Sequence, residues 1–255
     1  MTDRGTGGTV EVDLEVGDGV AVLTLNAPER RNALTPQMAG EMVAALERVD
    51  ADDSVGALVI RGAGGRFCAG AHTGTLAGAG ADPADDATYT GLSVIYESFT
   101  RVGRVRAFTI AAVRGAAVGA GMNLALATDM RVVAGNARLM SGFLRIGLHP
   151  GGGHFVLLSR LAGREAAAAM ALGGAEIDGD RAVALGLAWE AVDDGAVEAR
   201  AMEFAAGVAK DPALARAAVR SFRMETGPPA VGWDTAVQTE RAPQMWSMRR
   251  RSGGR

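Results

Sequence analysis

The sequence predicts a mixed α/β fold that is followed by a helical C-terminal region. Short apolar runs typical of buried strands alternate with amphipathic segments of helical periodicity over residues 9–195. Residues 196–255 show helical patterns and no strand pattern. Strand-strand-helix units recur loosely, as in a coiled stack of turns, over residues 9–50, 57–104 and 108–128. We therefore expect a ββα core over residues 9–195 and a helical oligomerisation region over residues 196–255.

The N-terminal elements of this core have clear local signals. Apolar and polar residues alternate over residues 10–16, a mostly apolar run covers residues 20–26, and a Gly-Asp-Gly turn separates the two runs, which predicts a hairpin. Thr35 followed by Pro36 is typical of a helix start, with a capping hydroxyl and a proline at the first helical position. The helix predicted here has one apolar face, formed by Met38, Met42, Leu46 and Val49.

The same criteria predict the rest of the chain. The predicted strands cover residues 57–60, 108–113, 130–134, 137–140 and 187–192. The predicted helices cover residues 92–102, 119–128, 155–161, 163–172, 178–185, 197–209, 212–225 and 233–248. Residues 73–87 are rich in Gly, Ala, Asp and Thr and have no apolar period, so we expect a mobile segment there.

Composition limits the classes of function. The chain has 255 residues, is 48% hydrophobic and carries a formal net charge of −3, which argues against a nucleic-acid-binding surface and permits a small acidic metabolite. Cys68 is the single cysteine, which excludes an internal disulfide framework and a purely cysteine-based zinc site. No apolar run is long enough to span a membrane, and no signal peptide is evident. We expect a soluble, cytoplasmic protein with a small-molecule substrate, no metal and no nucleic-acid partner.

Two glycine-rich loops are the strongest functional signal. Residues 61–71 follow the first apolar run after the predicted N-terminal helix, and residues 113–124 follow the next such run and lead into a helix. Glycine permits tight turns and lets other groups approach the backbone closely. Peptide N–H groups at the start of a helix have no partner within the helix. Two such donors, one from each loop, could hold a single carbonyl oxygen as it becomes an oxyanion.

These loops belong to a longer series of motifs. The series comprises residues 26–34 (NAPERRNAL), 67–71 (FCAGA), 112–121 (AVRGAAVGAG), 129–133 (DMRVV) and 147–153 (GLHPGGG). With these motifs in this order and spacing, the chain resembles the crotonase (enoyl-CoA hydratase/isomerase) superfamily over roughly residues 20–225. The resemblance implies a crotonase-like spiral of ββα turns, a C-terminal α-helical trimerisation region and an acyl-CoA substrate.

The resemblance also implies which residues form the site. By position, the thioester carbonyl would lie between the backbone N–H groups of Ala71 and Ala120. The assembly would be a homotrimer or a dimer of trimers, and no cofactor would be needed beyond the CoA moiety of the substrate. Members of the family often place a basic residue near the CoA phosphates at the position of Arg31 and its neighbour Arg30. A solvated pair of loop residues agrees equally well with the sequence there. The positions assigned to CoA binding are Arg31, Ala69, Gly70 and Phe143.

The chain departs from the family pattern at the acid–base positions. Hydratases of the family use two glutamates, and the matching positions here are Asn123 and Phe143. Asparagine can orient a water molecule but has no titratable proton near neutral pH, and phenylalanine can do neither. The aspartate that often follows the first oxyanion residue is replaced by His72. Standard hydratase chemistry therefore lacks both of its usual groups.

His72, His149 and Asn123 are the catalytic candidates beside the two oxyanion positions. Histidine titrates near neutral pH, so an imidazole at position 72 or 149 could transfer a proton. Each candidate also has a structural alternative. His72 could bond a backbone group of its loop, His149 and the nearby His154 could cap the following helix, and Asn123 could be a structural amide. The sequence leaves these alternatives open.

Four other residues are better explained by structure than by catalysis. Tyr89 and Tyr96 could supply a phenol, but packing or surface tyrosines fit their positions better. Cys68 is most simply a small buried residue. Asp129 stands at a strand start and is interpreted as structural.

Three functions therefore remain open. The leading hypothesis is an acyl-CoA enzyme of the hydratase/isomerase type that stabilises a thioester enolate. The alternatives are an acyl-CoA decarboxylase or thioester hydrolase, and a non-catalytic acyl-CoA binding protein. They differ in whether a titratable side chain lies within hydrogen-bond reach of the reacting carbons.

Overall fold

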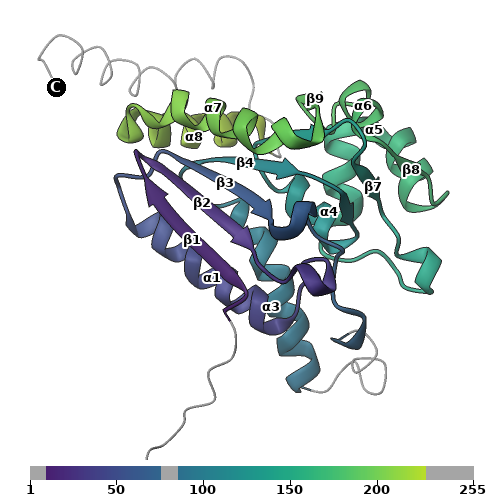
Figure 1. The fold of residues 1–255 in the computed structure, drawn as a ribbon. Helices are drawn as coiled ribbons and strands as arrows, with labels where there is room; N and C mark the ends of the chain where they lie inside the picture. The colour runs from purple at the N-terminus through teal and green to yellow at the C-terminus, as the bar shows by residue number, and fades with distance from the viewer. Residues whose placement is uncertain (1–9, 76–85, 228–255) are drawn as a thin grey trace, which may run out of the picture.

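The computed structural model describes residues 10–75 and 86–227, and its main feature is a mixed sheet (Figure 1). Within these residues the first sheet is six-stranded, and its strands are ordered β1-β2-β3-β4-β6-β9. β1 pairs antiparallel with β2 as a hairpin, and every later pair is parallel. The strand bounds are Val12–Gly17 (β1), Val20–Leu25 (β2), Ala57–Gly62 (β3), Phe108–Val113 (β4), Met130–Ala134 (β6) and Glu190–Val192 (β9). The predicted hairpin and the mixed α/β class are confirmed.

A smaller second sheet lies beside the first. It joins β5 (Ala116–Val118), β7 (Arg138–Met140) and β8 (Glu176–Ile177) in the order β5-β7-β8. β5 pairs parallel with β7, and β7 pairs antiparallel with β8. Because β5 follows β4 after two residues, the chain passes from the first sheet to the second at the second glycine loop.

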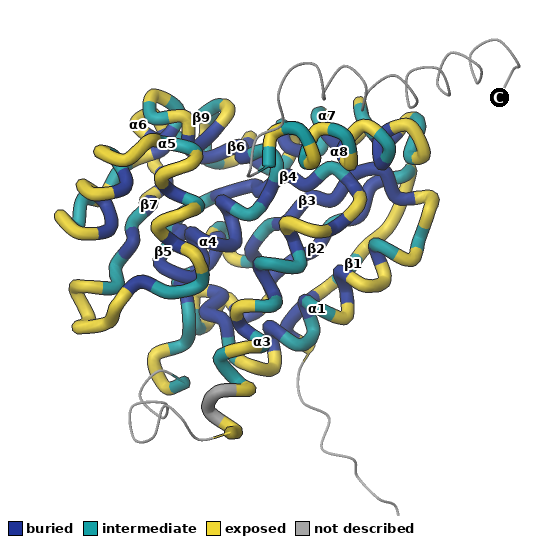
Figure 2. Tube along the Cα trace, turned by 180° about the vertical axis from the view of Figure 1, so that it is seen from behind, coloured by how far each residue is buried: buried dark blue, intermediate teal, exposed yellow. Residues whose placement is uncertain are grey.

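Helices cover both faces of the first sheet. α1 packs beneath β1 and β2 and against α3, whereas α7 lies over β3, β4 and β6 on the other face (Figure 1). The buried strands form the dark interior between these layers in Figure 2. The helix bounds are Pro36–Ala51 (α1), Asp86–Val102 (α3), Ala120–Leu126 (α4), His154–Ala171 (α5), Gly179–Ala184 (α6), Val197–Ala209 (α7) and Pro212–Thr226 (α8).

The first helix forms for the local reasons that the sequence indicates. The Thr35 hydroxyl accepts a hydrogen bond from the Met38 N–H at 3.1 Å, and Pro36 occupies the first helical position. Burial of its apolar face against the sheet stabilises the helix, since this face is removed completely from solvent at Met38, Met42 and Leu46.

Several predicted elements differ in extent from those observed. α3 begins at Asp86 rather than at residue 92, because packing along α1 extends the helix beyond its apolar part. The helices predicted over residues 155–161 and 163–172 are one element, α5, with a break at Gly163, whose φ is +79°. The last strand covers only Glu190–Val192, since the N–H groups of Leu187 and Ala188 donate to the Ala182 carbonyl of α6 and not to a neighbouring strand. In the segment predicted to be mobile, residues 73–75 and 86–87 are helical and residues 76–85 lie outside the described residues.

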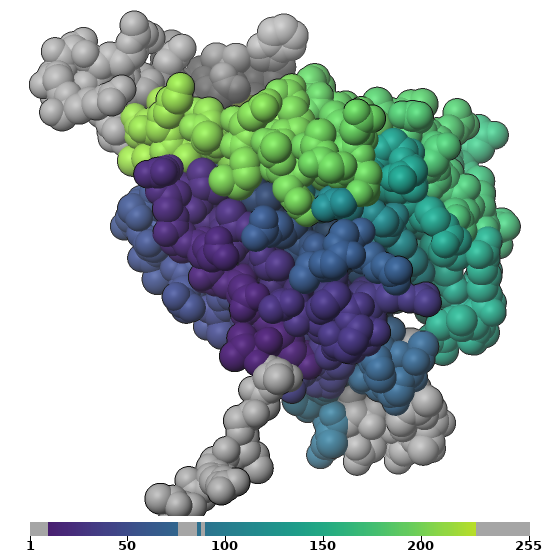
Figure 3. Space-filling view, viewed as in Figure 1, coloured from purple at the N-terminus to yellow at the C-terminus, as the bar shows by residue number. Residues whose placement is uncertain are grey.

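The C-terminal helices pack on the core. α7 buries Val197, Ala201 and Ala205 against the sheet, and α7 and α8 together cover its upper side in Figure 3. The guanidinium of Arg216 on α8 donates to the carbonyl oxygens of Val55 at 2.7 Å and of Val49 at 2.9 Å, so α8 is fixed to the loop after α1. A role of residues 196–255 in oligomerisation stays a prediction, and the helix predicted at 233–248 lies outside the described residues. No helix in the described ranges has the length and apolarity to cross a membrane.

Candidate active site

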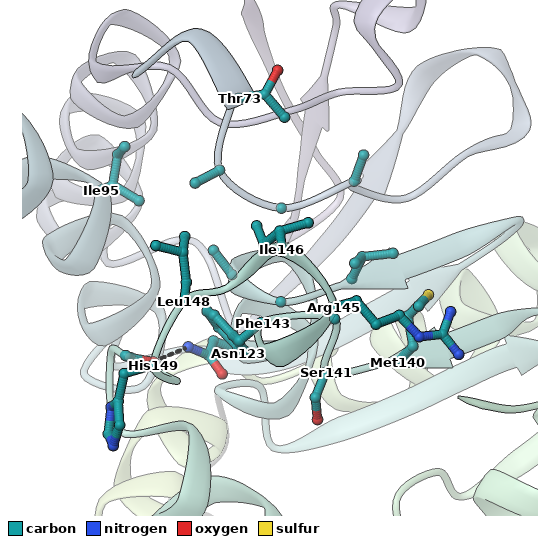
Figure 4. Close-up of a pocket in the computed structure, with 18 of the residues that line it drawn as sticks. Thr73, Ile95, Asn123, Met140, Ser141, Phe143, Arg145, Ile146, Leu148 and His149 are labelled. Atoms are coloured by element: carbon teal, nitrogen blue, oxygen red, sulfur yellow. Dashed lines mark hydrogen bonds between the residues drawn. The ribbon is translucent and has the colours of Figure 1, made fainter. Parts of the chain in front are cut away.

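A cavity of about 490 Å³ opens where the two glycine loops meet (Figure 4). The first loop contributes Ala69, Gly70 and Ala71, and the start of α4 contributes Ala120 and Asn123. α3 and the segment after β7 close the other sides with mostly apolar side chains, including Leu92, Ile95, Phe143, Ile146 and Leu148. The cavity is therefore apolar with few polar groups, as expected for an acyl chain.

Backbone pairing fixes the two glycine loops next to each other. The Cys68 N–H donates to the Ala116 carbonyl at 3.0 Å, and the Val118 N–H donates to the Cys68 carbonyl at 3.1 Å. A Cβ atom on Gly121 would lie 2.3 Å from the Cys68 oxygen, so only glycine permits this approach. Gly70 has a φ of +92°, and a Cβ atom there would lie 2.6 Å from the Val118 oxygen. These glycines are needed to bring Ala71 and Ala120 to one cavity.

The N–H groups of Ala71 and Ala120 have no acceptor among the described residues. On either side of Ala71, the Gly70 carbonyl accepts from Leu34 at 2.8 Å and the His72 N–H donates to Leu34 at 2.8 Å. In extended backbone successive peptide groups point to opposite sides, so the Ala71 N–H points away from Leu34. Ala120 is the first residue of α4, where the N–H has no helical partner. Two unpaired donors therefore belong to residues that line the same cavity.

Asn123 forms the polar part of the cavity floor. Its Nδ2 donates to the Gly151 carbonyl at 3.0 Å, drawn as a dashed line in Figure 4. Its Oδ1 lies 2.7 Å from Nδ1 of His154, and Nε2 of His154 lies 2.6 Å from Oγ of Ser141. All three side chains are almost completely buried, and burial lowers the pKa of His154 from 6.5 to about 4. His154 is therefore neutral at physiological pH.

This lowered pKa makes the stability of the protein depend on pH. Between about pH 4 and 6.5 the unfolded chain binds a proton at His154 that the folded protein does not, so stability rises with pH in this window. The resulting gain in the free energy of unfolding is up to about 3 kcal/mol. This gain is complete above pH 6.5 and is lost as the pH falls towards 4. We expect His154→Gln to flatten the pH dependence of urea unfolding relative to wild type, with His149→Gln as the control that keeps it. Equal slopes in wild type and His154→Gln would contradict this prediction.

The described residues that line the cavity include no carboxylate. Their titratable side chains are those of Tyr96, Arg145 and His149. Nδ1 of His149 lies 2.7 Å from the Pro150 carbonyl oxygen, and its ring extends to the edge of the site, away from Thr73, in Figure 4. The Tyr96 hydroxyl lies 2.7 Å from the position that a Cβ atom on Gly151 would take, so it lies beside the residue whose carbonyl binds the Asn123 amide.

The structure brings together most of the residues predicted for the site. Seven of them line the cavity, namely Ala69, Gly70, Ala71, Ala120, Asn123, Phe143 and His149. His72 and Arg31 are not among its lining residues. Nδ1 of His72 accepts a hydrogen bond from the Gly74 N–H at 3.2 Å, which is the backbone contact considered as its structural alternative. Arg31 is exposed, and its side chain makes no ion pair with any described residue, whereas Arg30 pairs with Glu11.

Three residues of the site did not stand out in the sequence. Ser141 and Arg145 lie in the segment after β7, which carries no recognisable polar motif. Tyr96 was interpreted as a packing or surface residue, but it lines the cavity together with Leu92 and Ile95. The spacing i, i+3, i+4 of these three residues on one helix face is the signal that could have identified it.

Two interpretations from the sequence are confirmed. Cys68 is fully buried, and burial raises the pKa of its thiol to about 12, so it is an unreactive packing residue. Asp129 is structural. Its Oδ2 accepts from the Thr109 N–H at 2.9 Å, and its carboxylate binds the Arg223 guanidinium, which joins β4 to α8.

The family model described as enoyl-CoA hydratase/isomerase matches residues 15–232 of this chain. The chain belongs to the enoyl-CoA hydratase/isomerase family. Among its relatives is a probable enoyl-CoA hydratase of Mycobacterium tuberculosis, 43% identical over 199 residues that cover 78% of this chain and 75% of the relative. The 1,2-epoxyphenylacetyl-CoA isomerase of Escherichia coli is 34% identical over 233 residues, which cover 89% of this chain and 86% of the isomerase.

Two solved structures have the same fold as this chain. An enoyl-CoA hydratase from Polaromonas sp. JS666 superposes with a TM-score of 0.86 at 27% identity, covering 95% of this chain and 93% of that one. Pseudomonas aeruginosa DspI superposes with a TM-score of 0.84 at 26% identity over 97% and 99% of the two chains. The chain is thus an enzyme of the hydratase/isomerase family, and its expected membership is confirmed.

Proposed function

We propose that this member of the enoyl-CoA hydratase/isomerase family binds an acyl-CoA thioester in the cavity and stabilises its enolate. The thioester oxygen would accept hydrogen bonds from the N–H groups of Ala71 and Ala120. The observation that carries the proposal is that two peptide N–H groups from separate loops, both without an acceptor in the described chain, belong to residues of one apolar cavity. Negative charge that develops on the thioester oxygen would be stabilised by these preorganised donors.

The groups around the donors favour a reaction that does not need a carboxylate base. Asn123 and Phe143 occupy the positions that the family resemblance assigns to the two hydratase glutamates, and no described lining residue is acidic. Tyr96 and His149 are the described lining side chains that could donate or accept a proton, besides the strongly basic Arg145. Isomerisation or slow hydration with one of these groups is compatible with this cavity.

Decarboxylation is the second candidate, and the lack of a described acidic lining residue favours it. In this reaction the bond between the α carbon and the carboxylate breaks, CO₂ leaves, and the bonding electron pair remains as the thioester enolate. The enolate then takes a proton from water or Tyr96. No base is required, and the oxyanion donors stabilise the charge that develops. A turnover screen over enoyl-, malonyl- and aromatic acyl-CoA thioesters tests both candidates, and no turnover of any class would leave a binding role.

Arg31 is proposed to bind the phosphates of CoA. Its side chain is exposed and unpaired among the described residues, and its carbonyl accepts from the Ala69 N–H at 3.0 Å, so it stands at the back of the first glycine loop. We expect Arg31→Ala to raise KM for a CoA thioester roughly two- to fivefold with little change in kcat, because an exposed ion pair contributes little. The matched substrate is the pantetheine thioester, which lacks the nucleotide phosphates and should show no change. An equal KM increase for both substrates would exclude a phosphate contact.

The oligomeric state is also a proposal. A homotrimer or a dimer of trimers follows from the family resemblance, and exposed apolar side chains on α8 at Phe222 and Met224 are compatible with a contact there. No cofactor beyond the CoA moiety is proposed.

A further inference from the structure

A chain of hydrogen bonds runs beneath the cavity floor, from the segment after β7 through α5 to α4. It consists of Ser141, His154 and Asn123, joined by contacts of 2.6 and 2.7 Å. Each side chain is at most 2% exposed. The ring of Phe143 packs edge-on against His154 with 5.0 Å between ring centroids, which holds the imidazole in place from a third side.

The chemistry of the three groups fixes the direction of every hydrogen bond. The Gly151 carbonyl can only accept, so the NH₂ group of Asn123 faces it and Oδ1 faces His154. Oδ1 can only accept as well, so Nδ1 of His154 carries the proton. Because desolvation lowers the pKa of His154 to about 4, the ring is neutral and Nε2 has a lone pair. The Ser141 hydroxyl then donates to Nε2. A single arrangement of protons satisfies all three side chains.

This arrangement also fixes the orientation of the Asn123 amide. Rotating the amide by 180° would set its oxygen against the Gly151 carbonyl oxygen, and His154 would have to move its proton to Nε2 for Nδ1 to accept from the NH₂ group. The buried hydrogen bond to Gly151 would become a contact between two acceptors, which is costly. Nδ2 is therefore held on the Gly151 side. One of its hydrogens binds the Gly151 carbonyl, and the second has no acceptor among the described residues.

The same three residue types could suggest a nucleophilic serine, but the geometry argues against it. The Ser141 oxygen points away from Phe143 and Ile146, beneath the floor, in Figure 4. A histidine with a pKa near 4 is also a poor acceptor for the proton of a nucleophile at neutral pH. The chain of hydrogen bonds is therefore suited to holding a group rather than to attacking one.

We propose that His154 is a positioning residue, which holds the Asn123 amide so that Nδ2 donates a hydrogen bond to an oxygen atom in the cavity. This oxygen belongs either to the acyl chain or to a water molecule beside the thioester. The inference rests on the proposed function for the identity of the ligand and on the described contacts alone for the orientation of the amide. A misplaced donor of this kind typically lowers the rate of an enzyme on the order of 10- to 100-fold.

A double-mutant cycle separates positioning from general stability. We expect Asn123→Ala and His154→Phe each to lower kcat on the best acyl-CoA substrate about 10- to 100-fold, and the double variant to be no worse than Asn123→Ala. Thr128→Val, which removes a buried hydroxyl bonded to the Ala125 carbonyl beyond the end of α4, is the control for lost stability and should retain activity. Multiplicative losses in the double variant would overturn the proposal.

Nuclear magnetic resonance detects which nitrogen of His154 is protonated, and therefore how the Asn123 amide is oriented, and it needs no substrate. It therefore distinguishes failure of this inference from failure of the proposed function. We expect the ¹⁵N-labelled protein to show a neutral His154 with the proton on Nδ1 from pH 5 to 8. Ser141→Ala removes the donor to Nε2 but leaves the Asn123 oxygen opposite Nδ1, so the proton should stay on Nδ1 and kcat should fall less than in His154→Phe. Asn123→Ala removes that acceptor and should give a mixture of tautomers. A wild-type His154 that is protonated on Nε2, or charged at pH 6, would overturn the proposal.

Two ligands identify the source of the oxygen. A 3-oxobutyryl-CoA thioester has a chain oxygen that butyryl-CoA lacks. If the acyl chain supplies the acceptor, Asn123→Ala and His154→Phe weaken binding of the 3-oxo thioester about tenfold and leave binding of butyryl-CoA unchanged. If water supplies it, both affinities are retained and only kcat falls. Full binding and full kcat in both variants would contradict either form of the proposal.

Discussion

Replacing Ala120 with proline is expected to lower kcat about 100- to 1000-fold while the protein stays folded. Ala120 is the first residue of α4, and its N–H has no acceptor in the described chain, so proline removes a donor that the fold does not use. Proline is also favoured at the first position of a helix. Steady-state kinetics with circular dichroism and thermal melting on the same preparation measure both parts of the prediction.

The matched control for this variant is Ala120→Gly, which removes the methyl group and keeps the N–H. It should lose at most severalfold in kcat. Ala71→Pro removes the other proposed donor and should show a loss similar to that of Ala120→Pro, with Ala71→Gly as its control. A folded Ala120→Pro protein with wild-type turnover would mean that this N–H does not contact the reacting oxygen.

The backbone of this site could be predicted because its requirements are local. Gly70 and Gly121 are needed where a Cβ atom would collide with the backbone of the facing loop, and each leaves a mark in the sequence. The apolar runs before both loops predict the strands that carry them, and the cap at Thr35 predicts the start of α1. The positions of Ala71 and Ala120 therefore follow from motif and resemblance together.

The polar side chains of the site could not be predicted in the same way. His72 follows Ala71 directly, and successive side chains in extended backbone point to opposite sides, so this catalytic candidate is absent from the lining of the cavity. Asn123 and His154 meet only because α5 packs beside α4, across 31 positions of sequence. No local sequence pattern predicts such a contact. Nor does one predict that burial keeps His154 neutral by lowering its pKa.

The second large effect is expected for hydration of crotonyl-CoA. Acid–base catalysis by a well-placed group is usually worth about 100- to 10,000-fold, and Asn123 and Phe143 cannot titrate at the positions matched to the two hydratase glutamates. We expect kcat to lie at least about 100-fold below that of a two-glutamate hydratase measured in parallel. The proposed donors and the apolar cavity remain, so KM should be similar and the loss should appear in kcat.

Substitutions of the remaining proton carriers complete this test. Tyr96 and His149 line the cavity, so any residual hydration should fall further in Tyr96→Phe or His149→Gln, whereas His72→Gln should have little effect because His72 is not a lining residue. Malonyl-CoA is the matched substrate, because its decarboxylation requires no base. The kcat for this reaction should therefore not be lowered in the way that the kcat for hydration is. Hydration as fast as in the two-glutamate enzyme, and insensitive to all three substitutions, would require an acid in the cavity from outside the described residues and would refute the proposed chemistry.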